Sequence, residues 1–437
     1  MAASYSGGTG ERAVAGKTGS ALALMTTLFF MWGFVTVLND VLIPHFKDAF
    51  QLSYARAYLV QSVWFIAYFV MSIPSAKILE RIGYKASLVG GLLVMAAGAA
   101  LFIPAAELFS YPLFLVALFA LASGITLLQV AANPYVAVLG SAASAPARLN
   151  LAQAFNTLGD TVAGPFGKLL ILGRSAAGVV VGAGAVAALS QAQRAADLKA
   201  VQMPYVLITG ILLVLALLVW RWRLPDVPAE QRRLAPDARA RLKLTSHRNL
   251  MWAIPAIAVY VLAEVSVGSS LVNFISSPQI ANISHEAAAS YLIYFWGGMM
   301  IGRFAGSYFL NRIRPELALA VGAAIATLLV GSAAVFHGSW VMWPLIAVGL
   351  CNSIMFPTIF TLGIRGLGPL TEEGSGLLIM AIVGGAGSWF QGVIADRYGL
   401  QPSYIIPALC YVYILAFALF GARPTAALPE QPLGLPA

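Results

Sequence analysis

Residues 221–248, RWRLPDVPAEQRRLAPDARARLKLTSHR, form the longest polar stretch of the 437-residue chain. The stretch holds eight Lys and Arg against three acidic residues, and six long apolar runs lie on each side of it. This arrangement predicts two similar halves joined by a basic linker. Such a linker either binds anionic lipid at the cytoplasmic membrane surface or is a plain solvated loop.

The composition excludes most classes of soluble protein. Hydrophobic residues make up 60% of the chain and charged residues only 10%, whereas a soluble domain has about 25% charged residues. The two cysteines, Cys351 and Cys410, lie within apolar runs, so neither a disulfide framework nor a zinc cluster is expected. The net charge of +9 resides largely in short loops between the runs, which indicates a membrane protein and no nucleic-acid partner.

The apolar runs have the length that a membrane helix requires. A bilayer core about 30 Å thick needs roughly 20 apolar residues per helix. The sequence therefore predicts an all-α membrane protein with twelve transmembrane helices, near residues 21–43, 57–78, 85–105, 112–140, 148–172, 203–220, 249–275, 286–309, 315–334, 339–363, 371–395 and 402–421.

One further apolar segment, 175–190, is short and rich in Gly and Ala, and we expect it to belong to a long external loop. With the N-terminus inside, 19 of the 26 Lys and Arg fall on the inner side, as the positive-inside rule requires. A thirteenth span would move the basic loop around Arg312 outside. We therefore predict a multi-pass protein of the bacterial inner membrane with both termini in the cytoplasm.

The two halves contain matching residues at corresponding places. Pro134, Leu139 and Gly140 recur 223 residues later as Pro357, Leu362 and Gly363. Duplicated halves are common in secondary transporters. We expect the domains to be a cytoplasmic tail, a six-helix bundle, the linker, a second six-helix bundle and a second cytoplasmic tail, at 1–20, 21–220, 221–248, 249–421 and 422–437.

Polar residues inside the predicted spans mark candidate binding sites, because such residues usually face a cavity or a partner. Gln129 and Asn133 are four residues apart and share one helix face, and Gln153, Asn156 and Asp160 share another. Amides both donate and accept hydrogen bonds, which suits a hydroxyl-rich ligand. The bland alternative is that these amides only join neighbouring helices.

The other candidates are single residues. Trp32 lies eight residues before Asp40, roughly on the same side of the first span, where it can stack on a sugar ring. Asp40 is a charge within a span, which by default indicates function, although it is close enough to the helix end to reach the interface. We expect Lys168 to extend to the interface, with a charge or ion role for Lys168 and Asp160 as the alternative. The remaining predicted substrate contacts are Asn39, Glu264, Asn273 and Asn352.

Motifs of common enzyme classes are absent. The chain has no GxxxxGK[ST], HExxH or GxSxG segment, so ATP hydrolysis, zinc proteolysis and serine esterase chemistry lack support. We therefore expect a secondary carrier with no catalytic residues, no metal and no cofactor.

Several longer segments resemble a known family. The segments 29–50, 128–140 and 149–159 resemble the fucose permease branch of the major facilitator superfamily, and 263–274, 294–307 and 356–368 are similar to the glucose/galactose transporters of that branch. The resemblance implies two six-helix bundles and proton-coupled hexose symport by alternating access. It assigns the proton to Asp40, and sugar contacts to Trp32, Gln153 and Asn156. The fucose permease pattern has a glutamate where this chain has Gln129.

Three alternatives remain open at this stage. Sodium can replace the proton as the coupling ion, with Asp40 or Asp160 as an oxygen ligand. A major facilitator exporter of another small metabolite would have an aromatic site with few amides, and a non-transporting sugar sensor would bind without uptake. We expect a monomer in contact with membrane lipid.

Overall fold

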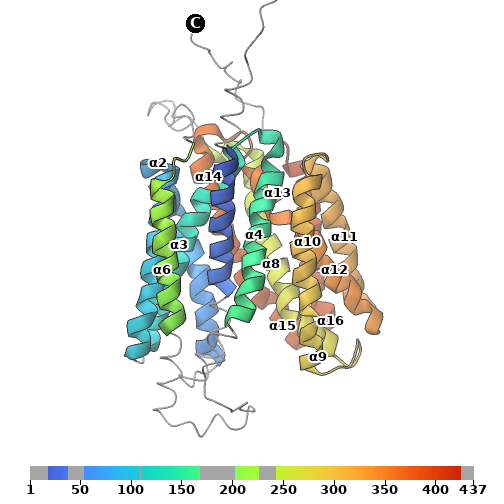
Figure 1. Ribbon diagram of the computed structural model, residues 1–437. Helices are drawn as coiled ribbons and strands as arrows, with labels where there is room; N and C mark the ends of the chain where they lie inside the picture. Colours follow the sequence, from blue (N-terminus) through green and yellow to red (C-terminus); the bar gives the residue numbers. More distant parts are fainter. Residues whose placement is uncertain (1–17, 38–53, 109, 168–201, 226–242, 425–437) are drawn as a thin grey trace, which may run out of the picture. The chain divides into compact units, whose positions relative to one another are not determined.

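The computed structural model describes residues 18–37, 54–108, 110–167, 202–225 and 243–424 (Figure 1). Within these residues the structure is helical and contains no strand. The backbone contacts divide the chain into two compact units. The N-terminal unit comprises Met1–Gly140 and Leu151–Asp226, and the C-terminal unit comprises Ser141–Asn150 and Val227–Ala437.

The N-terminal unit is built from long apolar helices that run side by side (Figure 1). Its helices are Thr18–Val37, α2 (Tyr54–Glu107), α3 (Tyr111–Val138), most of α4 (Ala145–Gly167) and α6 (Gln202–Arg221). α2 contains two predicted spans, because the backbone leaves helical geometry at Gly83, with φ 80° and ψ 173°. Glycine takes a positive φ without steric cost, so the chain turns there in a single residue.

Aromatic and small residues hold this unit together. α2 packs along α3 and α6, and the ring of Phe102 stacks on Tyr205 with centroids 4.1 Å apart. The first helix meets α4 backbone to backbone. A Cβ added at Gly33 would lie 2.6 Å from Asn156 Nδ2 and 2.7 Å from Asp160 Oδ1. Glycine therefore permits the close contact that sets the α4 polar face against the first helix.

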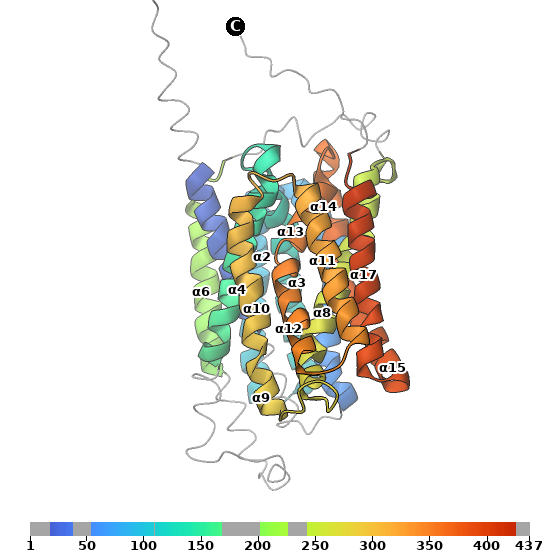
Figure 2. The ribbon, with the colours of Figure 1, turned by 90° about the vertical axis from the view of Figure 1, so that its right-hand side faces the viewer.

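The C-terminal unit has more interruptions. Its α-helices are α8 (Arg248–Ser276), α9 (His285–Ser290), α10 (Leu292–Phe309), α11 (Pro315–Val335), α12 (Met342–Asn352), α13 (Met355–Ile364), α14 (Thr371–Met380), α15 (Ser388–Tyr398), α16 (Leu400–Ser403) and α17 (Ile405–Ala416). The unit also contains the 3-10 helices η1 (Ala142–Ser144), η5 (Leu244–Ser246), η6 (Ser339–Val341), η7 (Gly368–Leu370) and η8 (Ala381–Gly387), and the π-helix η9 (Phe417–Gly421). α11 and α17 lie side by side, as Figure 2 shows.

The predicted span 339–363 is a broken helix. α12 ends at Asn352 and α13 begins at Met355. Pro357 has no N–H, so it cannot bond to the carbonyl four residues earlier, and the helix is interrupted at that turn. The far end of α13 is capped by Asn249 of α8. The Asn249 Nδ2 donates to the carbonyls of Leu362, Gly363 and Arg365 at 2.9, 3.0 and 2.8 Å, which satisfies groups that helix ends leave open.

The predicted spans all correspond to helices. Nine segments of the described chain are long and apolar enough to cross a membrane, and one of them, Ser62–Glu107, contains the two spans that meet at Gly83. The other two spans are α4, which carries several polar residues, and α10, which has 18 residues. Large apolar side chains are exposed along α6, including Leu207, Ile211 and Val214. An exposed apolar face is what a helix in contact with lipid requires.

Candidate functional site

The polar face predicted on α3 lies inside the N-terminal unit. Gln129 is 4% exposed, and its amide nitrogen Nε2 donates to Tyr68 Oη of α2 at 2.5 Å. Four residues on, Asn133 is fully buried, and neither Oδ1 nor Nδ2 has a hydrogen-bond partner among the residues that the structure describes. A buried polar group without a partner costs about 1–3 kcal/mol. Asn133 therefore has both a donor and an acceptor available for a ligand.

The face predicted on α4 is also buried, but part of it joins helices. Gln153 is 4% exposed and Asn156 8%. Asn156 Nδ2 donates to the carbonyl oxygen of Phe29 at 3.0 Å, which ties α4 to the first helix. Trp32, 5% exposed, packs on the Phe29 ring with centroids 4.3 Å apart. The structure thus brings Trp32, Asn156 and, through Gly33, Asp160 close together.

In the C-terminal unit, Glu264 and Asn352 are joined by tyrosines. Tyr260 Oη donates to Glu264 Oε1 at 2.8 Å and lies 3.3 Å from the Asn352 carbonyl oxygen. Tyr411 Oη of α17 donates to Asn352 Oδ1 at 2.8 Å. Asn352 is fully buried, and its Nδ2 has no partner within the described chain. Arg303 of α10, 7% exposed, interacts electrostatically with Glu264.

The remaining predicted residues are not brought to these clusters. Asn273 is exposed, one turn before the end of α8 and about 14 Å along the helix axis from Glu264. Asn39, Asp40 and Lys168 lie outside the described residues, as does the segment 175–190.

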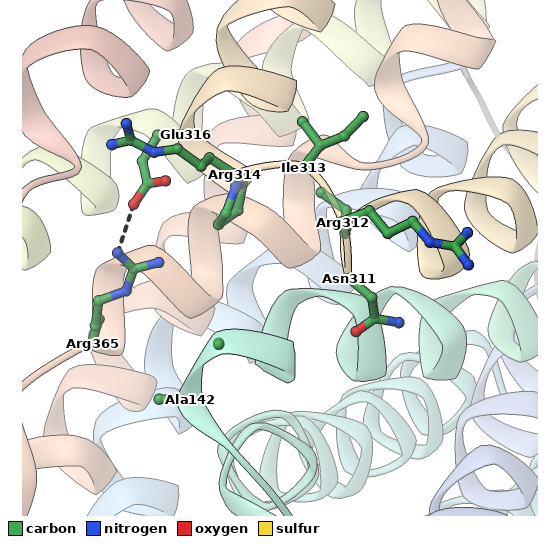
Figure 3. Close-up of a pocket in the computed structure, with 10 residues that line it drawn as sticks. Ala142, Asn311, Arg312, Ile313, Arg314, Glu316 and Arg365 are labelled. Atoms are coloured by element: carbon green, nitrogen blue, oxygen red, sulfur yellow. Dashed lines mark hydrogen bonds and ion pairs between the residues drawn. The ribbon is translucent and has the colours of Figure 1, made fainter.

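A separate hollow of about 410 Å³ lies where α10 passes into α11 (Figure 3). Arg365 Nη1 binds Glu316 Oε1 at 2.6 Å at one side of it, and Arg312 points away from that pair onto the ring of Tyr308, 3.9 Å from the centroid. None of the predicted site residues lines this hollow. Among the described residues no group of His, Cys, Asp and Glu could hold a metal ion.

Comparison with known proteins identifies the family. The sequence model of the Major Facilitator Superfamily matches residues 21–376. The chain belongs to the major facilitator superfamily. The fold class predicted from the sequence, twelve transmembrane helices in two six-helix bundles, is confirmed by this match and by the similar solved structure described in the next paragraph.

Two curated relatives of this superfamily chain cover nearly its whole length. It is 46% identical over 406 residues to a protein of Brucella abortus called glucose/galactose transporter, covering 93% of this chain and 95% of that protein. It is 38% identical over 411 residues to the L-fucose-proton symporter of Escherichia coli, covering 92% and 93%. The solved structure of the transporter FucP in the outward conformation matches with a TM-score of 0.83 and 36% identity, covering 92% of this chain and 98% of that one.

Sequence reasoning did not identify the three tyrosines or Arg303 as members of these polar clusters. Tyr260 precedes Glu264 by four residues on one helix, a spacing at which side chains meet, so its hydrogen bond had a signal in the sequence. Tyr68 and Tyr411 reach their amide partners across 61 and 59 residues of chain. No local pattern indicates contacts between residues so far apart.

Proposed function

We propose that this protein is a secondary active transporter that carries a hexose together with a proton by alternating access. The observation that carries the proposal is the pair of fully buried asparagines, Asn133 and Asn352, which keep amide atoms without partners among the described residues. Buried amides without partners are unfavourable for folding alone. They suit a ligand that presents several hydroxyl groups, each of which donates and accepts.

The names of the relatives support a hexose as the substrate. The more similar of the two is called a glucose/galactose transporter, and the other an L-fucose-proton symporter. We therefore place glucose and galactose first, with an L-fucose-like sugar second. In this proposal the sugar contacts are residues predicted from the sequence: Trp32, Asn39, Gln129, Asn133, Gln153, Asn156, Glu264 and Asn352. The predicted contact Asn273 is left out, because it is exposed near the end of α8.

The proton is assigned to Asp40. A charged carboxylate within a membrane span is costly, so proton binding lowers the free energy of closing the site around it. Asp40 takes a proton when the site is open to the outside and releases it when the site is open to the cytoplasm. Asp160, whose Oδ1 lies close to Gly33, and Lys168 are assigned to a supporting charge role.

The placement in the cell follows from the distribution of charge. We propose a bacterial inner-membrane protein with both termini in the cytoplasm, acting as a monomer surrounded by lipid. The excess of Lys and Arg on one side of the predicted spans supports this orientation.

Uptake into proteoliposomes tests the function. Radiolabelled glucose, galactose, L-fucose and xylose are offered with an inward proton gradient, an inward sodium gradient, or neither. We expect glucose or galactose to accumulate only with the proton gradient. Accumulation driven by sodium alone would replace the proton with sodium, and no uptake of any sugar would reject sugar transport.

A further inference from the structure

Four helices of the C-terminal unit contribute to one connected set of polar side chains, which we call the Glu264 cluster: Tyr260 and Glu264 of α8, Arg303 of α10, Asn352 of α12 and Tyr411 of α17. The proposed function gives Glu264 and Asn352 a sugar contact and gives Arg303 no role. The geometry of the cluster indicates more than sugar contact, because it contains a carboxylate, a fixed cation and a hydroxyl with two acceptors.

The hydroxyl of Tyr260 has one hydrogen and two acceptors within reach. Glu264 Oε1 is at 2.8 Å, and the Asn352 carbonyl oxygen is at 3.3 Å. When Glu264 is ionised, the hydroxyl donates to the carboxylate, because hydrogen bonds to a charged acceptor are about twice as strong as neutral ones. When Glu264 holds a proton, the carboxyl group donates to Tyr260 Oη, and the tyrosine hydrogen is free to turn to the Asn352 carbonyl.

That carbonyl lies at a special place in the fold. Asn352 is the last residue of α12, directly before the break that separates α12 from α13. α10 touches the same break, since a Cβ added at Gly302 would lie 2.5 Å from Ser353 Oγ. The protonation state of Glu264 therefore decides whether Tyr260 bonds to the carboxylate or to the interrupted helix. In many transporters, discontinuous helices form the binding sites for the substrate and the coupling ion.

Arg303 supplies the opposing charge. Arginine carries a permanent positive charge, and Arg303 is 7% exposed. A buried cation needs an anion nearby, and removing that anion is strongly destabilising. Protonation of Glu264 therefore removes the negative charge that faces Arg303.

Tyr260 and Tyr411 are the other titratable groups that interact with Glu264. Tyr411 also interacts electrostatically with Cys351 and Cys410. α13 and η8, which pack on α8, carry no titratable side chain.

We propose that Glu264 is a second proton-binding group of the transport cycle, with Arg303 as its counter-charge and Tyr260 as the positioning residue that links it to the α12–α13 break. The proton comes from solvent on one side of the membrane, is held as the O–H of the Glu264 carboxyl group and returns to solvent on the other side. This inference rests on the proposed function, because it needs sugar movement coupled to protons.

The test uses the double variant Glu264→Gln/Arg303→Gln, which removes both charges together and so leaves no buried charge unpaired. The matched control is Glu316→Gln/Arg365→Gln, the same chemical change in the partly exposed ion pair of Figure 3. Each protein is placed in proteoliposomes. Hexose-driven proton uptake is followed with an enclosed pH-sensitive dye, and hexose affinity is measured by thermal shift.

We expect the Glu264 and Arg303 double variant to lose at least tenfold in hexose-driven proton uptake while its affinity for hexose falls less than tenfold, and the control to resemble the native protein. Native proton uptake in the double variant would overturn the inference, as would a loss of hexose binding equal to the loss of proton uptake. If the native protein itself shows no hexose-driven proton uptake, the proposed function fails first.

A single substitution covers the case in which the double variant does not fold. Tyr260→Phe removes the hydrogen bond to the ionised carboxylate, which then binds its proton more readily. We expect the pH profile of hexose counterflow to move toward higher pH. An unchanged profile at native protein yield would contradict the positioning role of Tyr260 and with it the inference.

Discussion

Replacing Asn133 by leucine separates a ligand-binding amide from a structural one. Leucine has the same branched arrangement of side-chain heavy atoms, with somewhat larger methyl groups and no polar atoms, so Asn133→Leu removes two buried groups that have no partner within the described chain. Each such group costs about 1–3 kcal/mol, so we expect the ligand-free protein to become more stable, by roughly 1–3 kcal/mol after some loss of packing. The lost sugar contacts act in the opposite direction. Two hydrogen bonds of about 0.5–1.5 kcal/mol each correspond to a fall in affinity of roughly 5-fold to 150-fold.

The assay is a thermal melt of the purified protein with and without hexose, and Asn249→Leu is the control. Asn249 is equally buried, but its amide nitrogen contacts three carbonyls at the end of α13. The same substitution there leaves these carbonyl oxygens without a hydrogen-bond donor. It should therefore lower the melting temperature and leave the affinity for hexose unchanged. A lower melting temperature and unchanged hexose affinity in Asn133→Leu would refute the reasoning, because Asn133 would then be a structural amide like Asn249.

Further outcomes follow from the packing and from the ion pair. Gly33→Ala pushes a methyl group into Asn156 and Asp160 and should lower the free energy of unfolding by about 1–3 kcal/mol or more. The control is Gly19→Ala in the same helix, where an added Cβ meets nothing within 4 Å among the described residues, so this variant should fold normally. Equal melting temperatures of the two variants would contradict the expectation. Gln129→Leu leaves Tyr68 Oη without its amide partner and should lower both stability, by roughly 1–3 kcal/mol, and hexose uptake. Glu316→Gln/Arg365→Gln removes an ion pair whose side chains are 21% and 31% exposed, so a chemical-denaturation shift above about 1 kcal/mol would be unexpected.

The positions of the helices can be predicted from the sequence, because the thickness of the membrane sets the length of each spanning helix. Twenty apolar residues between basic loops can form little other than a spanning helix, and α6, α8 and α11 each begin and end within about two residues of the predicted limits. The break at Asn352 was not predicted, although Pro357 gave a signal for it. In α3 the helix continues through Pro134, so a proline alone does not decide whether a membrane helix is interrupted.

The site is harder to predict, because a hydrogen-bond partner is a property of the folded chain. Asn133 and Asn249 are both buried amides in apolar helices, yet one has no partner among the described residues and the other has three. Periodicity correctly places Gln153 and Asn156 together inside the N-terminal unit, but it does not reveal that Asn156 bonds to a carbonyl of the first helix. Such differences depend on contacts between residues more than a hundred positions apart.

The most direct measurement of the central claim is the external pH of a weakly buffered proteoliposome suspension when hexose is added without any imposed gradient. If sugar and proton enter together, the medium becomes alkaline on addition of glucose or galactose, in sodium-free buffer, and the change disappears in Asp40→Asn. A medium whose pH does not change while labelled hexose enters, or an entry that requires sodium, would contradict proton-coupled transport.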